Sequence, residues 1–165
     1  MNDICHKKRD LVEKLGVFIE QKDSLAPVAA RILSYIILTG KVGTTFEDLV
    51  TQLCASKSTI STHLNHLSDL KRIEYFTKAG DRKKYYIINR DSILQHIDEM
   101  ITTWNVQKNL HSEIKDYKES VNNLPETEEK DMFDLTFHIN YLEFLAEATS
   151  SISNLKEKLK NNPKL

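Results

Sequence analysis

Cysteine and glycine are scarce in this chain of 165 residues, and each scarcity excludes a class of protein. The two cysteines, Cys5 and Cys54, lie far apart and form no CxxC pair, so we expect neither a disulfide framework nor a zinc ribbon. The four glycines are scattered, whereas a phosphate-binding loop needs several glycines close together.

The chain also lacks long hydrophobic runs and the short motifs of common enzymes. Its longest apolar run, residues 32–38, is far too short to span a bilayer. The polar N-terminus MNDICHKKRD is unlike a signal peptide. None of the P-loop, GxGxxG, GxSxG or HExxH patterns occurs. We therefore expect a cytoplasmic protein that is not an enzyme, has no metal or other cofactor, and has no membrane partner.

Net charge is nearly absent as well, at −1, but the charged residues are unevenly distributed. Residues 57–84 hold seven Lys and Arg against three acids, whereas residues 91–165 hold eight Lys against fourteen acids. A nearly neutral chain can bind DNA when its electric field is polarised in this way. We expect the basic segment to face nucleic acid and the acidic final third to stay away from it.

A helix-turn-helix pattern occupies the middle of the chain. Thr45 is placed to cap a short helix, and Asp48 stands where a capping box has its acid. The small residues 54–56 predict a tight turn that lets two helices cross closely. Ser56 then caps a second helix, residues 57–72.

The second helix of this motif has two unlike faces. Ile60, Leu64 and Leu67 share one face, which predicts their burial. The opposite face carries short polar side chains, which let a backbone approach a DNA groove, whereas ordinary exposed helices favour Glu, Lys and Gln. The helix N-terminus also offers free N–H groups to a phosphate. From this helix and its cap we expect the DNA contacts Ser56, Lys57, Ser58, Thr59, Ser61, Thr62 and Asn65.

Two runs rich in β-branched and aromatic residues, 73–77 and 85–88, follow and predict a small hairpin, or wing. The glycine of the connecting KAGDRKK segment can adopt the positive φ of a tight turn. We expect Arg82 at this basic tip to enter a minor groove, and Lys83 and Lys84 to contact phosphates.

Amphipathic helices flank the motif on both sides. Residues 4–22 and 27–39 carry apolar stripes at helical spacing. After the wing, one long helix is capped by Asp91 or Ser92 and a second extends over residues 128–160. Their apolar stripes are too long to be buried in so small a protein, so we expect a helical hairpin that mediates dimerisation.

The expected fold is therefore mainly α-helical with a small β wing. We divide the chain into an N-terminal helix that joins the dimer interface (1–24), a winged helix-turn-helix DNA-binding domain (25–90) and a helical dimerisation arm (91–165). The final residues KNNPKL are expected to be disordered.

The segment from Ala26 to Asp91 resembles the GbsR-type branch of the MarR-like winged-helix transcriptional regulators. The resemblance rests on the APVAARIL opening, the KSTISTHLNHL helix and above all the GDRKKYY wing. It implies a cytoplasmic, dimeric, DNA-binding regulator, typically a repressor that acts near its own operon. The expected partners are double-stranded DNA at a pseudo-palindromic operator and a second copy, bound through the N- and C-terminal helices. Some relatives also sense a small molecule, so an unidentified effector is a further expected partner.

Other interpretations of the same residues stay open. The winged fold could serve as a protein-interaction adaptor that binds no DNA. His63 and His66 have an i, i+3 spacing that can bind a metal, but no Cys or carboxylate with ligand spacing stands beside them, which favours a polar role. Cys54 lies between apolar neighbours, which favours a small buried side chain over a redox switch.

The aromatic residues of the arm have two interpretations. They could form the core of a dimer, which we favour, or line an effector cavity between the arm and the winged domain, because ligand sites often form where domains meet. These residues are Trp104, Tyr117, Phe133, Phe137, Tyr141 and Phe144.

Overall fold

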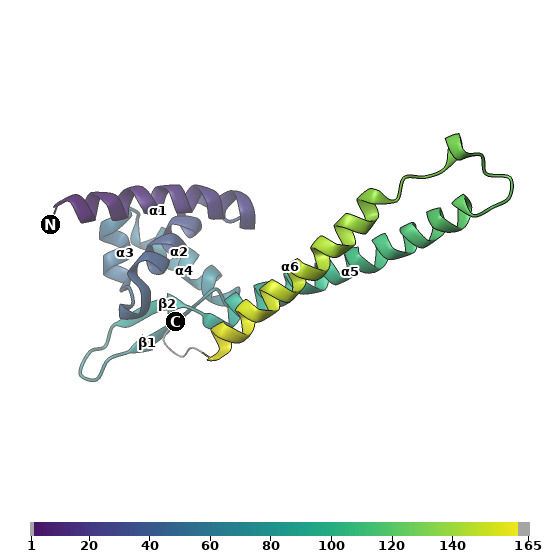
Figure 1. Cartoon of the computed structure of the whole chain (residues 1–165). Coiled ribbons are helices and arrows are strands. Elements are labelled where there is room, and N and C mark those ends of the chain that lie inside the picture. Colours follow the sequence, from purple (N-terminus) through teal and green to yellow (C-terminus); the bar gives the residue numbers. More distant parts are fainter. Residues whose placement is uncertain (1, 162–165) are drawn as a thin grey trace. The chain divides into compact units, whose positions relative to one another are not determined.

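The computed structural model describes residues 2–161, which form two compact units divided between Ser92 and Ile93. Among these residues the first unit contains α1 to α4 and an antiparallel sheet of β1 and β2, and the second contains most of α5 and all of α6 (Figure 1). The expected fold class, mainly helical with a two-stranded wing, is confirmed.

The first two helices of the first unit pack closely against each other. α1 (Asn2–Asp23) and α2 (Pro27–Thr39) approach at Gly16, where a Cβ atom would lie 2.9 Å from Cγ of Arg31. The Arg31 guanidinium then binds α1 through a 2.9 Å hydrogen bond from Nε to Glu13. This bond raises the pKa of Arg31, so the guanidinium stays charged.

The hydrophobic core of this unit is formed mainly by α2, α3 (Phe46–Gln52) and α4 (Lys57–Asp69), and Ile19 of α1 and Ile73 also belong to it. Full burial of each aliphatic side chain stabilises the fold by about 1.5–3 kcal/mol. The capping box predicted for α3 is present, because Thr45 Oγ1 accepts from the Asp48 N–H and the Asp48 carboxylate accepts from the Thr45 N–H. The largest fully buried core side chains are Ile32, Leu33, Ile36, Leu49, Ile60 and Leu67.

The expected second helix of the motif ends three residues earlier than the sequence suggested, at Asp69 rather than at residue 72. Lys71 adopts a left-handed backbone with φ of 54°. The N–H of Arg72 then donates to the Leu67 carbonyl at 2.9 Å, which closes the helix end and turns the chain into the first strand. Helical propensity does not register this turn, because Lys is a good helix former.

The wing is formed by β1 (Ile73–Thr77) and β2 (Lys84–Ile88), with Ile73 opposite Ile88. A third segment joins the sheet, because Thr44 exchanges two 2.9 Å backbone hydrogen bonds with Tyr86. The sequence did not reveal this bridge, since a single residue carries no periodicity. It ties β2 to the segment that precedes α3.

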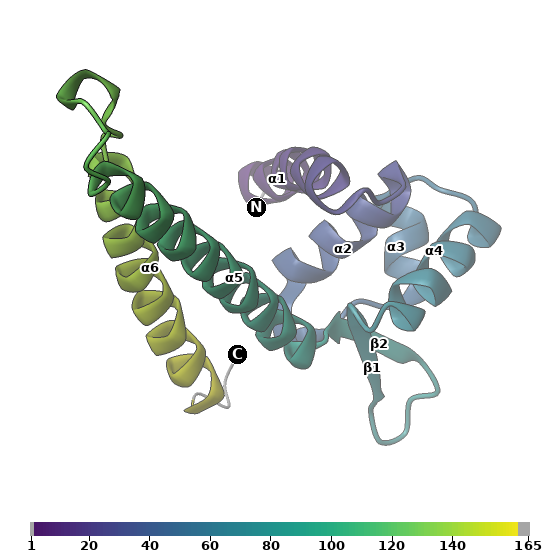
Figure 2. The same ribbon diagram turned by 90° about the vertical axis from the view of Figure 1, so that its right-hand side faces the viewer.

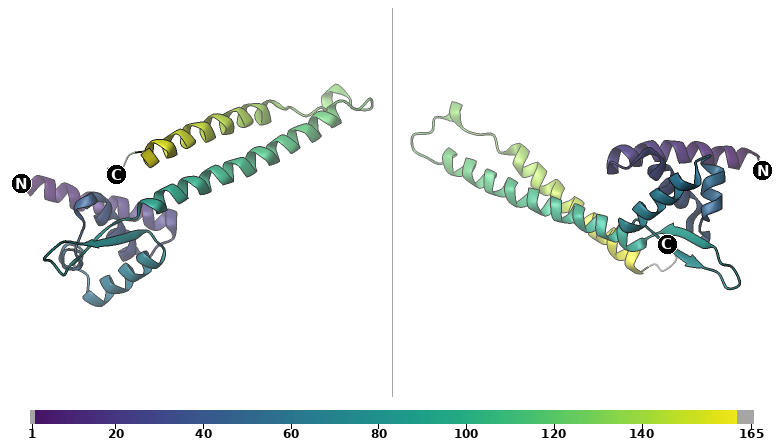
Figure 3. Two further views of the ribbon diagram at one scale, coloured as in Figure 1. Left: turned by 90° about the horizontal axis from the view of Figure 1, so that it is seen from below. Right: turned by 180° about the vertical axis from the view of Figure 1, so that it is seen from behind.

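In the second unit, α5 (Arg90–Asn122) and α6 (Thr136–Asn161) lie side by side and antiparallel (Figure 2; Figure 3). The Tyr141 hydroxyl donates to Gln107 at 3.4 Å, and the Lys156 ammonium binds Asp98. The predicted helical hairpin is therefore present. Its role in dimerisation stays a prediction.

Both helix starts in the hairpin differ from the expected ones. α5 is capped by Asn89, whose side-chain oxygen accepts from the Asp91 N–H at 3.0 Å, instead of by Asp91 or Ser92. α6 begins at Thr136 instead of residue 128. The Asn122 amide binds both the N–H and the carbonyl of Phe133 and holds this segment out of a helix. Within the expected disordered tail, Lys160 and Asn161 are helical, and residues 162–165 lie outside the described part of the chain.

Candidate nucleic-acid interface

The two faces of α4 are separated as the sequence predicted. Ile60, Leu64 and Leu67 are buried in the core. Ser58, Ser61, Thr62 and Asn65 are all exposed. A helix whose aliphatic face is buried and whose opposite face carries mostly short polar groups can approach a major groove closely.

The hydroxyl groups at the start of α4 form a local network. Ser56 caps the helix as predicted, because its Oγ accepts from the Thr59 N–H at 3.1 Å. The same oxygen lies 2.9 Å from Ser58 Oγ and 2.8 Å from Thr59 Oγ1. Thr62 Oγ1 donates to the Ser58 carbonyl at 3.0 Å. Hydroxyls with a second lone pair can still accept from or donate to DNA, but their positions are set by the helix.

Two other polar side chains on this face make no hydrogen bond within the described part of the chain. Ser61 and Asn65 are exposed, and neither side chain makes a hydrogen bond to the described residues. An Asn amide can bind the N6 and N7 edge of adenine through two bonds. Among the expected contacts on α4, Asn65 therefore has the side-chain chemistry best suited to reading a base.

Cys54 is exposed, so the expectation that it is a small buried side chain was wrong. Its backbone is left-handed, with φ of 49°, directly after the end of α3. This conformation turns the chain sharply toward α4 and directs the side chain outward, where its Sγ lies 3.7 Å from the Thr51 carbonyl. The turn between the helices is thus made by a strained residue as well as by small ones.

The tip of the wing is held in place by Asp81. Its carboxylate accepts a 2.7 Å hydrogen bond from the Tyr85 hydroxyl and a 2.9 Å bond from the Lys83 N–H. The Tyr85 bond is the main reason that the pKa of Asp81 lies below its usual range and that of Tyr85 above. Gly80 supplies the turn with φ of 78°, as predicted.

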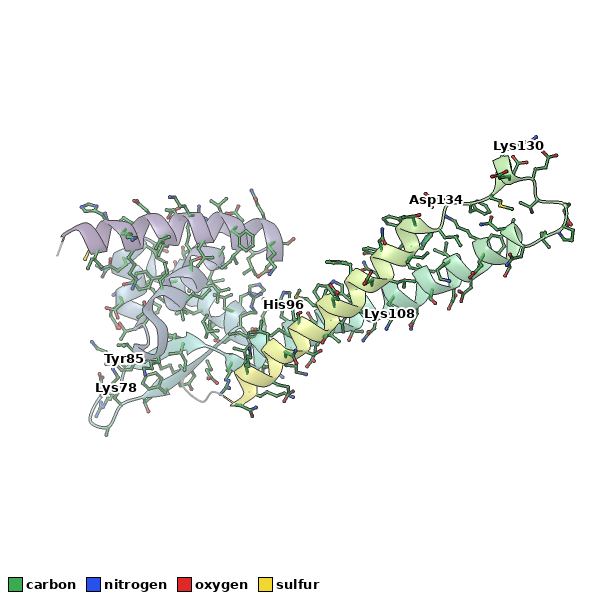
Figure 4. The ribbon with its side chains drawn as sticks, viewed as in Figure 1. Lys78, Tyr85, His96, Lys108, Lys130 and Asp134 are labelled. Carbon is green, nitrogen blue, oxygen red and sulfur yellow. The ribbon has the colours of Figure 1, made fainter. Side chains whose placement is uncertain are left out.

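Aromatic rings support the cations of the wing. Lys78 Nζ lies 3.8 Å from the centre of the Tyr85 ring, and the two residues are adjacent in Figure 4. Lys84 Nζ lies 4.1 Å from the centre of the Tyr75 ring. This expected phosphate contact therefore already makes a cation–π contact within the wing. Phe76 stacks on Tyr85 from the facing strand. Lys78 was absent from the predicted site, although its place in the basic KAGDRKK loop was a usable signal.

Arg82 and Lys83 extend from the tip into solvent. Both are exposed, and neither side chain makes a hydrogen bond or ion pair with the described part of the chain. The same holds for Lys57 at the start of α4 and for Lys71 after its end. Arg72 differs, since its guanidinium binds Asp23 of α1 at 2.7 Å and is therefore committed to the fold. Within α4 and the wing, the cations without a protein partner among the described residues therefore lie at the wing tip and at the two ends of α4.

Over residues 2–161 no group of three or more His, Cys, Asp or Glu side chains is arranged to hold a metal ion. His63 and His66 lie on α4 beside its buried stripe. No helix in the described chain combines the length and the apolar character needed to cross a membrane.

Comparison with known proteins agrees with this geometry. No protein-family model matches the chain. The chain is similar to the HTH-type transcriptional regulator MmpR5 of Mycobacterium tuberculosis, with 34% identity over 77 residues. The match covers 47% of this chain and 46% of MmpR5, so the chain spans about half the length of the curated relative it matches.

Two solved structures align with nearly the whole chain. A crystal structure described as a transcriptional regulator aligns with a TM-score of 0.51 and 21% identity, over 94% of this chain and 99% of that chain. A mutant of S. aureus MepR aligns with a TM-score of 0.41 and 19% identity, over 93% and 94% of the two chains. The second score is too low to indicate a shared fold. The first alignment shows a shared fold, in which four helices are followed by the two-stranded β1–β2 wing and a long helical hairpin.

Proposed function

We propose that this protein is a sequence-specific, DNA-binding transcriptional regulator and not an enzyme. The observation that supports this proposal most strongly is the pairing of an exposed, short-chained polar face on α4 with a wing whose Arg82 and Lys83 lack protein partners among the described residues. α4 enters the major groove, Arg82 the adjacent minor groove, and Lys57, Lys71 and Lys83 contact phosphates. The similarity to MmpR5 supports the same function.

The finer assignment is to the GbsR-type branch of the MarR-like regulators, acting as a dimeric repressor in the cytoplasm. Exposed apolar side chains support dimerisation. On α1, Ile4 is 76% and Phe18 is 58% exposed, and on α5, Tyr117 is 67% exposed. Apolar surface of this extent on isolated helices is usually covered by another protein surface. A dimer places two α4 helices in successive major grooves, about 34 Å apart, on a pseudo-palindromic site.

The proposal is tested by selecting bound duplexes from a random oligonucleotide pool with the purified full chain, and by measuring its mass in solution with light scattering. Enrichment of a two-fold symmetric sequence by a dimer is the expected result. A monomer that enriches no sequence would overturn the proposal.

A protein-interaction adaptor is the alternative function, and the exposed apolar residues of the second unit are the observation that favours it. It predicts that the chain binds a partner protein through the arm and shifts no promoter fragment. A DNA-binding regulator instead elutes from heparin only at high salt. Its binding releases counterions from the polyanion, and a high salt concentration reverses that release. A regulator with a small-molecule effector, whose identity the sequence does not suggest, would show ligand-dependent release of DNA.

A further inference from the structure

The α5–α6 hairpin encloses an imidazole that DNA binding does not use. His138 of α6 is only 6% exposed, although the surrounding helices are largely exposed. Each of its two ring nitrogens lies within hydrogen-bond distance of a side-chain nitrogen of α5. Nδ1 lies 3.0 Å from Nδ1 of His111, and Nε2 lies 3.0 Å from Nζ of Lys118.

The chemistry of these three side chains permits one arrangement of protons. A lysine ammonium donates hydrogen bonds and accepts none, so Nε2 of His138 is an acceptor and carries no proton. A neutral His138 then carries its proton on Nδ1 and donates it to His111. Nδ1 of His111 must be bare, which places the proton of His111 on Nε2. With both rings neutral, the result is a directed chain of hydrogen bonds from Lys118 through His138 to His111.

No acid within this cluster can stabilise an added proton. The charged and titratable groups that act on the His138 ring are Lys118 and His111, both on α5. The Phe137 ring packs edge-on against the His138 ring, and the Tyr141 ring packs edge-on against His111. Asp134, just before α6 in Figure 4, is exposed and accepts from the Thr136 N–H. Lys118 is in turn held over the Phe133 ring at 5.3 Å.

We propose that Lys118, His138 and His111 form a proton-sensitive clasp that joins α5 to α6 near neutral pH and opens on mild acidification. A proton added to Nε2 of His138 faces the Lys118 ammonium, and a proton added to Nδ1 of His111 faces the N–H of His138. In either case two donors oppose each other at 3.0 Å, one hydrogen bond is lost and like charges meet. Local separation of the two helices then lowers the free energy of the protonated hairpin.

The direction of the pH effect follows from the burial of His138. Burial, followed by the neighbouring Lys118 and His111, lowers the pKa of His138 below its usual value. The open hairpin therefore binds the proton more tightly than the closed one. The stabilisation is complete above the ordinary histidine pKa and is lost as the pH falls from there toward the lowered pKa of the closed state.

The proton arrangement is tested by long-range ¹H–¹⁵N correlation spectra of the histidine rings in the full chain at pH 7.5. His138 is expected as the Nδ1–H tautomer and His111 as the Nε2–H tautomer. An Nε2–H tautomer of His138 would overturn the proposal, because that proton would point at Lys118. In Lys118→Met this constraint is removed, and the titration midpoint of His138 is expected to move to higher pH.

The opening itself is tested by hydrogen exchange, corrected for intrinsic rates, at pH 7.5 and pH 5.5. Protection of residues 136–150 of α6 is expected to fall severalfold, and by no more than about tenfold, which is the most that one group with the ordinary histidine pKa can supply one pH unit below that pKa. Protection of residues 27–39 of α2 is the internal reference and should not change with pH.

Two variants complete this experiment. His138→Leu removes the titrating ring and should abolish the response of residues 136–150, whereas His96→Gln, a change at an exposed histidine of the same hairpin, should preserve it. A wild-type hairpin whose protection is equal at both pH values overturns the proposal, as does a full response in His138→Leu. If His138→Leu does not fold, the tautomer of the wild-type ring and the midpoint in Lys118→Met decide the question.

Discussion

The Tyr85 hydroxyl donates a 2.7 Å hydrogen bond to the Asp81 carboxylate and thereby joins β2 to the tip of the wing. The other carboxylate oxygen accepts from the Lys83 N–H. Arg82 lies between these anchored residues, so its backbone is ordered before DNA binds. Because a preformed contact loses less conformational entropy on binding, this bond should contribute to affinity although neither Asp81 nor Tyr85 need touch DNA.

Replacement of Tyr85 by Phe is predicted to weaken DNA binding modestly. The ring stack on Phe76 remains, and only the hydroxyl that orders the tip is removed. We expect a loss of about three- to tenfold, the range for one hydrogen bond, in fluorescence anisotropy titrations at fixed salt. Because the pKa of Asp81 is lowered, its carboxylate stays charged and bonded until the pH falls below the usual carboxyl range. The loss should therefore be constant between pH 6 and pH 8.

Tyr75→Phe is the matched control for this prediction. Tyr75 lies on the partner strand, and its hydroxyl makes no hydrogen bond in the described part of the chain. The ring that supports Lys84 is retained in the variant. Equal losses in Tyr75→Phe and Tyr85→Phe would show that wing order is not the cause.

Replacement of Arg82 by Ala is predicted to weaken operator binding by about 1–3 kcal/mol, the cost of removing a groove contact. The side chain is exposed and makes no bond to the described residues, so the fold should be unaffected. Gel-shift titration measures the affinity, and circular dichroism verifies the fold. Lys14→Ala, which removes an exposed cation from α1, should leave affinity unchanged. If Lys14→Ala weakens binding as much as Arg82→Ala, general charge and not the wing is responsible.

Salt is predicted to weaken DNA binding steeply, because each cation that neutralises a phosphate releases a counterion. A plot of log affinity against log salt should be linear. In Lys83→Gln the slope should decrease by about one, the contribution of one phosphate contact. A flat salt response in the wild-type protein would mean that the basic wing does not face the duplex.

Gly43 and Gly80 are predicted to differ in their tolerance of alanine. Both have φ of 78°, which by itself costs about 1–2 kcal/mol for a residue with a side chain. A Cβ at Gly43 would also lie 2.8 Å from Cβ of Tyr85, whereas a Cβ at Gly80 meets nothing within 4 Å. Urea denaturation should therefore show a greater loss of stability for Gly43→Ala than for Gly80→Ala. The reverse order would mean that β2 does not pack against Gly43 in solution.

The elements of the fold that depend on local patterns were predictable from the sequence. The stripe of Ile60, Leu64 and Leu67 and the caps at Thr45 and Ser56 required only helical periodicity and short polar side chains. The wing required two β-rich runs and a glycine. Each of these signals is contained within a few consecutive residues, which is why periodicity and propensity were sufficient.

The features that were mispredicted depend on residues distant in the chain or on backbone strain. Asn122 holds Phe133 out of α6 across eleven positions, and no helical pattern reports such a bond. Cys54 is exposed because its backbone is left-handed, and apolar neighbours in sequence do not reveal that conformation.

The sequence alone therefore determined which helix presents polar side chains and where the positive charge is concentrated, because both follow from the order of residues along a helix and a hairpin. Only the tertiary structure decided which of those charges are available. It commits Arg72 to Asp23, supports Lys78 and Lys84 on tyrosine rings and leaves Arg82 exposed. It also decided that His138 is buried between Lys118 and His111. Such pairings are set by packing between segments that are separated by many residues, and that packing is a property of the folded chain.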